Sequence, residues 1–287
     1  QHISFIDRYD PEYVIILSGD QICKQDYSEF LNFHKEKNAD FSVAVMEVPW
    51  EEASRFGLMV TDENCKITEF QEKPKNPKSN LASMGNYIFK WSVLRQYLID
   101  DEADPTSDND FGKNIIPKLL ADGRDMYAHR FDGYWKDVGT IPSLWEANMD
   151  LLGKNPNFDI FDKNWKIYTR NAPYPPHFVA KTGEINNSLV SSGSYIEGKV
   201  INSLIGLNVI IKEGAVVENS IILDNVVINK YVNHPSRNCF PYSDMEIHYV
   251  DSSMNFNELF EYDKIYLNFI GSSCAKLDKY KFFNKIK

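Results

Sequence analysis

The sequence lacks the features that would place it in several common protein classes. Its four cysteines are far apart and form neither a CxxC pair nor a Cys/His cluster; they are Cys23, Cys65, Cys239 and Cys274. This scatter indicates neither a zinc site nor a small disulfide framework, and it is typical of a reducing compartment. No apolar run approaches the length of a membrane span. We therefore expect no membrane attachment and a cytoplasmic location.

Positive charge is also in short supply. The 287 residues carry 31 Lys and Arg against 41 Asp and Glu, which gives a net charge of −10. Nucleic acids and anionic membranes are bound by clustered Lys and Arg, so the composition argues against both partners. The chain also begins with Gln rather than Met, and we expect it to be a fragment of a longer protein.

What the sequence does contain near its start is an apolar run that ends abruptly, YVIILSGD, over residues 13–20. The run shows no alternation, which predicts a strand buried on both faces. Asp20 would then lie at the carboxyl end of that strand, where ligands bind in open α/β sheets. Its carboxylate is a hard oxygen ligand of the kind that suits magnesium. The alternative is that Asp20 merely closes a turn.

Strand and helix patterns alternate as far as Leu152. Helical spacing predicts helices over 26–38, 91–99, 111–121 and 142–152. Apolar runs predict strands over 41–48, 84–89 and 126–131, and the segments 58–60 and 67–70 flank turn residues as a hairpin does. The alternation predicts an α/β domain over residues 1–152 with a mostly parallel sheet.

The pattern changes after the Pro-rich stretch 153–176, which we interpret as a linker. Over 177–230, apolar residues recur every six positions in two series: Leu204, Ile210, Val216, Ile222 and Ile228, and Ile205, Ile211, Val217 and Leu223. This period is typical of a left-handed hexapeptide β-helix, whose coils bury apolar edges against their neighbours. An ordinary set of short strands is the alternative. The period is lost in 231–287, an atypical tail whose structure the sequence does not indicate.

Six short motifs follow one another through the first domain: LSGD (17–20), ASRFG (53–57), EKPKNP (72–77), SMG (83–85), NDFGKNIIP (109–117) and YWKDVGT (134–140). Their order and spacing, followed by a hexapeptide domain, resemble the sugar-1-phosphate nucleotidyltransferases, most closely the bacterial glucose-1-phosphate adenylyltransferases. The resemblance covers about residues 1–230 and implies a Rossmann-like first domain whose sheet is incomplete at its N-terminal side. It implies the reaction of ATP with glucose 1-phosphate to give ADP-glucose and pyrophosphate for glycogen synthesis.

The resemblance also implies roles for individual residues. Asp20 and Asp137 match the carboxylate pair that holds Mg²⁺, the expected cofactor. Lys73 matches the lysine that binds the sugar phosphate, and Glu72 matches the acceptor for glucose hydroxyls. Asp20, Lys73 and Asp137 would align the two substrates and screen their charge during catalysis. The remaining matches are sugar-contacting positions: Gly57, Ser83 and Gly85.

Several positions depart from the family pattern. Gln21 and Cys23 stand where the family usually has His and Tyr, and Asn86 and Asn109 also replace the usual residues. The family opens with a Gly-rich GxGxR loop for the ATP triphosphate, and no such segment occurs in these 287 residues. We therefore expect this chain alone to be weakly active or inactive, with an exposed sheet edge.

Two other functions stay open. The chain could be a noncatalytic regulatory subunit that binds an active homologue through its hexapeptide domain, or a nucleotidyltransferase for another nucleotide or sugar. A hexapeptide acyltransferase is less favoured, because no catalytic His stands among the repeats. The resemblance also implies a homo- or hetero-tetramer assembled through the hexapeptide domain, with an effector that the sequence does not identify.

Overall fold

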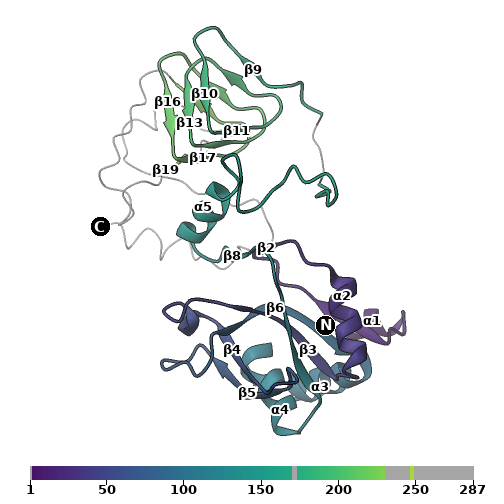
Figure 1. The fold of residues 1–287 in the computed structure, drawn as a ribbon. Helices are drawn as coiled ribbons and strands as arrows, with labels where there is room; N and C mark the ends of the chain where they lie inside the picture. Colours follow the sequence, from purple (N-terminus) through teal and green to yellow (C-terminus); the bar gives the residue numbers. More distant parts are fainter. Residues whose placement is uncertain (1, 170–172, 230–245, 249–287) are drawn as a thin grey trace. The chain divides into compact units, whose positions relative to one another are not determined.

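A computed structural model of the chain describes residues 2–169, 173–229 and 246–248 (Figure 1). The predictions for the tail lie outside the described residues, apart from the short strand β19 (Glu246–His248). Contacts divide the chain into two compact units, Gln1–Asp137 and Val138–Lys287, which we describe separately. In the part of the chain that is described, no helix is both long enough and apolar enough to cross a lipid bilayer.

The first unit is built on a six-stranded sheet of order β5–β4–β6–β3–β7, with β1 paired to β6 beyond the end of β4. Its strands are β1 (Tyr13–Ile16), β3 (Phe41–Glu47), β4 (Gly57–Thr61), β5 (Ile67–Glu72), β6 (Leu81–Lys90) and β7 (Met126–Arg130). The predicted α/β class is confirmed with one correction, because the sheet is mixed rather than mostly parallel. Among the described pairs, β3–β7 is parallel and the others are antiparallel. Apolar runs report burial and carry no information on strand direction.

Helices cover both faces of this sheet. Those of the first unit are α1 (Ile3–Asp7), α2 (Tyr27–Glu36), α3 (Trp91–Ala103), the π-helical turn η2 (Phe111–Ile115) and α4 (Ile116–Ala121), with a 3₁₀ turn η1 (Ala53–Arg55). Successive β3 side chains point to opposite faces: Val43 joins Leu94 and Leu119 of α3 and α4, whereas Ala44 joins Phe30 of α2. The predicted helices are confirmed, and α1 was not predicted.

Strand β1 differs from the strand that was expected to be buried on both faces. The side chain of Ile15 is 42% exposed and that of Leu17 is 45% exposed. Among the described strands, β1 pairs through one edge with β6, and its other edge has no strand beside it. An apolar run therefore overestimates burial where a strand has a single neighbour.

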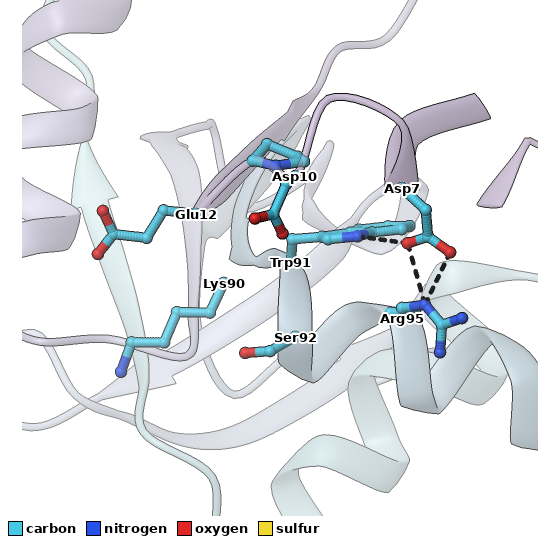
Figure 2. A pocket seen from close by; sticks show the side chains of 8 residues that line it. Asp7, Asp10, Glu12, Lys90, Trp91, Ser92 and Arg95 are labelled. Carbon is cyan, nitrogen blue, oxygen red and sulfur yellow. Dashed lines mark hydrogen bonds and ion pairs between the residues drawn. The ribbon is translucent and has the colours of Figure 1, made fainter. Parts of the chain in front are cut away.

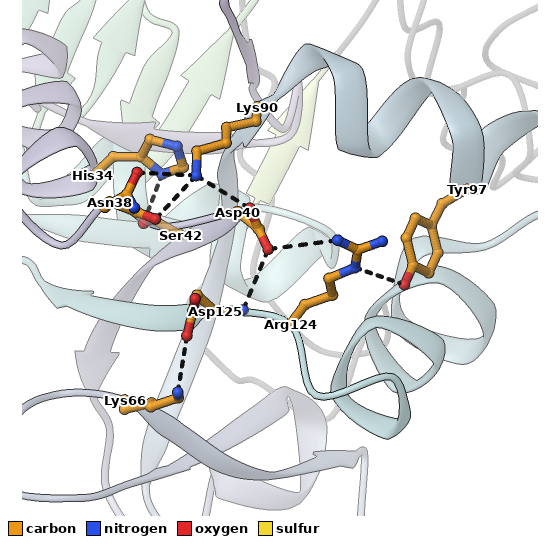
Figure 3. Close-up of polar contacts among 9 residues, drawn as sticks. All are labelled: His34, Asn38, Asp40, Ser42, Lys66, Lys90, Tyr97, Arg124 and Asp125. Carbon is orange, nitrogen blue, oxygen red and sulfur yellow. Dashed lines mark hydrogen bonds and ion pairs between the residues drawn. The ribbon is translucent and has the colours of Figure 1, made fainter.

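A polar network ties α2, β3 and the end of β6 to the turn before β7 (Figure 3). Lys90 Nζ donates to Asp40 Oδ1 at 3.2 Å, and Arg124 Nη1 lies 3.9 Å from the other oxygen of Asp40. His34 is fully buried, with Nδ1 2.8 Å from Ser42 Oγ. Burial lowers the pKa of His34 to about 4, and the charge of Lys90 adds to this effect.

The second unit begins with α5 (Ile141–Met149) and continues into a parallel β-solenoid of three sheets. The solenoid strands are β9 (Phe178–Val179), β10 (Glu184–Asn186), β11 (Leu189–Val190), β12 (Tyr195–Ile196), β13 (Lys199–Ile201), β14 (Leu204–Ile205), β15 (Ile210–Ile211), β16 (Val216–Glu218), β17 (Ser220–Ile222) and β18 (Val227–Ile228). Leu189 pairs with Leu204, fifteen residues later, and Leu204 pairs with Ile221, seventeen residues later. The predicted β-helix is confirmed.

The hexad of the solenoid is less regular than the sequence pattern indicated. Ile205, Ile211 and Val217 point into the core six residues apart, and the next core positions are Ile222 and Ile228. The step from 217 to 222 is five residues, so the core passes from one predicted series to the other. Val216, a member of the first series, is 39% exposed.

Asparagine side chains form a ladder at one corner of the coils. Asn187, Asn202 and Asn219 each have a positive φ, between 44° and 49°. Asn187 Nδ2 donates to Asn202 Oδ1 at 2.8 Å, and Asn202 Nδ2 donates to Asn219 Oδ1 at 2.6 Å. Asn is one of the few residue types that tolerates this backbone region, so one residue both turns the chain and links neighbouring coils.

Candidate active site

Two short strands bring together the segments that carry Asp20 and Asp137, the predicted metal ligands. β2 (Gln21–Cys23) pairs antiparallel with β8 (Trp135–Asp137), and Gln21 lies directly opposite Asp137. Opposite residues in such a pair have Cα atoms about 4.5 to 5.5 Å apart. Asp20 immediately precedes Gln21, so the two carboxylate-bearing residues are neighbours in space although more than a hundred residues separate them.

The loop that carries Asp20 is shaped by Gly85 of β6. The Ser18 hydroxyl donates to Asp20 Oδ1. Gly85 has a φ of +73°, beside a register shift between β3 and β6, and a Cβ placed there would lie 3.2 Å from Ser18 Cβ. A side chain at this position would meet both backbone strain and a close contact. The structure therefore places predicted residue Gly85 against the loop that carries Asp20.

A second group of predicted residues lies in a row across three adjacent strands. Gly57 of β4 is opposite Glu72 of β5, and the next residue of β4, Leu58, is opposite Ala82 of β6. Ser83 follows Ala82 and is therefore close to Gly57. A Cβ on Gly57 would lie 3.0 Å from Glu72 Oε2. Glycine at this position leaves room for the carboxylate.

Sequence reasoning did not select Gly112, which borders Glu72 from another side. A Cβ on Gly112 would lie only 2.7 Å from Glu72 Oε2. Gly112 belongs to η2, and the cap of that turn is Asp110, whose Oδ1 accepts from Lys113 N at 3.0 Å. The motif NDFGKNIIP contained this glycine, but nothing in the motif indicated which side chain it faces.

Two cations accompany the carboxylates. Lys73 has a φ of +43°, and its Nζ lies 3.7 Å from Glu72 Oε1 on a largely exposed side chain. Arg55 Nη2 lies 4.0 Å from Asp137 Oδ2. Arg55 lies in the ASRFG motif but was not selected as a site residue. The segment from Arg55 to Gly57 connects the two groups, since it reaches Asp137 at one end and Glu72 at the other.

The neighbourhood of Glu72 also affects Tyr87. Burial is the main cause that raises the pKa of Tyr87, while a hydrogen bond with Ser83 lowers it and the charges of Glu72 and Asp110 raise it further. Tyr87 therefore stays protonated and neutral at physiological pH, within reach of the charges of Glu72 and Asp110. Ser83, a predicted sugar-contacting residue, is thus engaged with Tyr87 in this structure.

The carboxylates fit a magnesium ion better than a fully protein-bound metal. Among the described residues, no group of three or more His, Cys, Asp or Glu is arranged to hold a metal ion. Mg²⁺ is usually bound by one or two carboxylates together with water and substrate phosphates. Asp20 and Asp137 are the two residues that could supply hard oxygen donors of that kind, and Arg55 places a positive charge beside Asp137.

A depression of about 650 Å³ lies at the other end of the β1–β6 pair (Figure 2). It is lined by Asp7, Lys90, Trp91 and Arg95 among others, and by none of the predicted site residues. Arg95 Nε and Trp91 Nε1 both donate to the Asp7 carboxylate, at 3.0 and 2.9 Å. These contacts hold α1 against α3, so the polar groups of Asp7, Trp91 and Arg95 already stabilise the fold.

Comparison with known proteins agrees with this arrangement. Residues 1–154 match the family described as Nucleotidyl transferase, and residues 174–235 match the one described as GlmU-like, C-terminal hexapeptide. Three similar curated proteins are each named glucose-1-phosphate adenylyltransferase. The protein from Acetivibrio thermocellus is 54% identical over 230 residues, that from Clostridium beijerinckii 55% over 221, and that from Bacillus cereus 50% over 232.

The aligned residues make up 77 to 81% of this chain and 54 to 62% of those three relatives. The chain therefore spans little more than half the length of the curated relatives that it matches.

Proposed function

Because the chain belongs to the nucleotidyl transferase family, we propose that it is the larger part of a glucose-1-phosphate adenylyltransferase. The reaction would join ATP and glucose 1-phosphate into ADP-glucose, with release of pyrophosphate. Support comes from the names and identities of the relatives, at 50 to 55%. The observation that carries the proposal is the β2–β8 register, which sets Gln21 opposite Asp137 and so makes Asp20 a neighbour of Asp137.

Asp20 and Asp137 would hold Mg²⁺ in this proposal. When bound, Mg²⁺ would neutralise charge on the phosphate oxygens of the substrates. Arg55, 4.0 Å from Asp137, is placed to limit the repulsion between the carboxylate pair and an incoming polyanion.

Lys73 and Glu72 would bind the second substrate. The exposed ammonium of Lys73 is free to swing on its four-carbon stem and to meet a sugar phosphate as a point charge. Glu72 would accept hydrogen bonds from sugar hydroxyls in the space left by Gly57 and Gly112. With both substrates aligned, attack of a glucose 1-phosphate oxygen on the α-phosphorus of ATP would release pyrophosphate.

Assembly through the solenoid belongs to the same proposal. A hexapeptide β-helix is present, and we propose that it joins copies of this chain, or this chain and a homologue, into a tetramer. Sedimentation of the isolated chain, alone and mixed with a catalytic homologue, would test this. A monodisperse monomer in both samples would count against it.

The activity is tested by measuring ADP-glucose and pyrophosphate in the presence of Mg²⁺. Two proteins are compared: this chain as it stands, and this chain joined to the part of the Acetivibrio thermocellus relative that it does not span. We expect the joined protein to form ADP-glucose and its Asp137→Ala variant to be inactive. A joined protein that binds both substrates without turnover would favour a noncatalytic regulatory subunit. Turnover with another nucleotide or sugar would instead change the proposed specificity.

A further inference from the structure

Asn86 is a polar side chain with no solvent exposure, in the middle of strand β6. Its Oδ1 accepts from Ser18 N at 3.4 Å and also from Gln21 Nε2. Its Nδ2 donates to Gln25 Oε1 at 2.9 Å. Gln21 Oε1 in turn accepts from Trp135 Nε1. One buried amide thus connects β6 with the loop after β1, with β2 and, through Gln21, with β8.

These contacts reach Asp20 and the segment that carries Asp137. On one side, Asn86 accepts from the backbone N of Ser18, and the Ser18 hydroxyl donates to Asp20. On the other side, Gln21 links Asn86 to Trp135, two residues before Asp137. The two carboxylates come from segments whose strand pairing, β2 with β8, is three residues long. Such a short pair is marginal by itself, so the buried amide adds the restraint that the pair lacks.

The network is not arranged for stability alone. Gln25 is 7% exposed, and its Nε2 has no hydrogen-bond partner among the described residues. A buried donor without a partner is costly, so stability alone does not account for a glutamine at this position. Buried polar networks with an unpaired member are found where specific geometry matters more than stability.

We propose that Asn86 is a positioning residue that sets the separation of Asp20 and Asp137. This rests on the proposed function in that the separation serves a divalent cation. The restraint that Asn86 places on the two segments, which we call the Asn86 clamp, can be measured without metal. It would act by holding residues 18–21 and 135–137 in one arrangement before the cation and the substrates arrive.

The test compares amide hydrogen exchange in three variants of the chain. Asn86→Leu removes all the hydrogen bonds of the amide at similar volume, and Gln21→Met removes the link to Trp135 should Asn86→Leu fail to fold. Ser42→Ala is the control, because it breaks another fully buried hydrogen bond in the same unit, the one with His34. We expect exchange to accelerate on the order of tenfold in residues 18–23 and 135–137 in the first two variants. The control should leave those segments unchanged.

Mn²⁺ affinity, measured on the same samples, separates the clamp from the proposed function. An affinity that falls about tenfold together with faster exchange supports both. Faster exchange in a chain that binds no Mn²⁺ even as wild type supports the clamp and contradicts the magnesium site. Exchange in both segments that is no faster than in Ser42→Ala overturns the clamp, whatever the affinity.

Discussion

The solenoid and the mixed sheet are held together over very different sequence separations. Among the solenoid strands β9 to β18, paired residues are fifteen or seventeen positions apart, and each coil packs on the coil before it. In the first unit, β1 pairs with β6 and β2 pairs with β8, across about 70 and more than 110 residues respectively. Because its repeats are local, the solenoid can be predicted from the period of its apolar residues. The candidate site depends on contacts that no local pattern encodes.

The largest expected loss of stability comes from a truncation in the solenoid core, which tests how local the contacts of the solenoid are. Ile211 is fully buried in β15, and Ile211→Ala should cost about 3 to 4 kcal/mol of unfolding free energy because it leaves a cavity. Hydrogen exchange should show the loss in β15 and its neighbours β12 and β18, since each coil contacts only adjacent coils.

Val216→Ala serves as the matched control, because Val216 is 39% exposed and its truncation should cost under about 1 kcal/mol. An equal loss of hydrogen-exchange protection in the mixed sheet after Ile211→Ala would contradict the expectation that the loss of stability stays within the solenoid.

Acid should weaken the first unit and spare the solenoid. His34 is neutral in the fold, with its pKa lowered to about 4 from 6.5. Below pH 6.5 the unfolded chain binds a proton that the fold does not, so stability falls by at most about 1.4 kcal/mol per pH unit down to pH 4. Burial also lowers the pKa of His129 in the same unit. Residues 178–229 contain no histidine.

Denaturant unfolding at pH 7 and pH 5 would measure this slope. His34→Gln should remove part of it, and addition of His129→Gln should remove most of what is left. A slope unchanged in the double variant would show that other groups cause the acid sensitivity.

A smaller effect is expected from the glycine that shapes the Asp20 loop. Gly85→Ala should cost about 2 kcal/mol, since φ is +73° and Ser18 Cβ would lie 3.2 Å away. Gly123→Ala is the control: φ is +68° but nothing lies within 4 Å of the added Cβ, so it should cost about 1 kcal/mol. Thermal unfolding of both variants isolates the Ser18 contact. Identical shifts would mean that this contact does not constrain the loop.

The smallest effect concerns the asparagine ladder. Asn202→Gly keeps the freedom for a φ of 47° and removes two side-chain hydrogen bonds, so it should cost about 1 kcal/mol. Asn202→Ala should cost about 1 kcal/mol more, because alanine is strained in this region. If the alanine and glycine variants are equally stable by chemical denaturation, backbone conformation is not what selects asparagine here.

The parts of the fold that could be predicted are the helices and strands that a local pattern of apolar residues indicates. The helix expected over 26–38 is found over Tyr27–Glu36, capped by Asp26, and the strand expected over 41–48 is found over Phe41–Glu47. Strand direction could not be predicted, and neither could the exposure of Ile15, because both depend on which strands lie alongside.

The candidate site shows the same division. Asp20 was selected from its place after an apolar run, Asp137 was named through a family resemblance, and the roles assigned to them and to Lys73 stay predictions. Arg55, Gly112 and Asn86 were not selected as site residues, because each matters through a partner far away in the sequence. The sequence alone does not show that the amide of Asn86 is buried or which side chains contact it, so its role could not be predicted.

The central claim is that residues 20 and 137 form one site for a divalent cation. Titration of the chain with Mn²⁺, followed by electron paramagnetic resonance, tests it most directly. We expect saturable binding that Asp20→Asn and Asp137→Asn each weaken at least about tenfold, and that Asp132→Asn, at an exposed acid nearby, leaves unchanged. Binding of equal strength in the wild type and in both site variants would contradict the account.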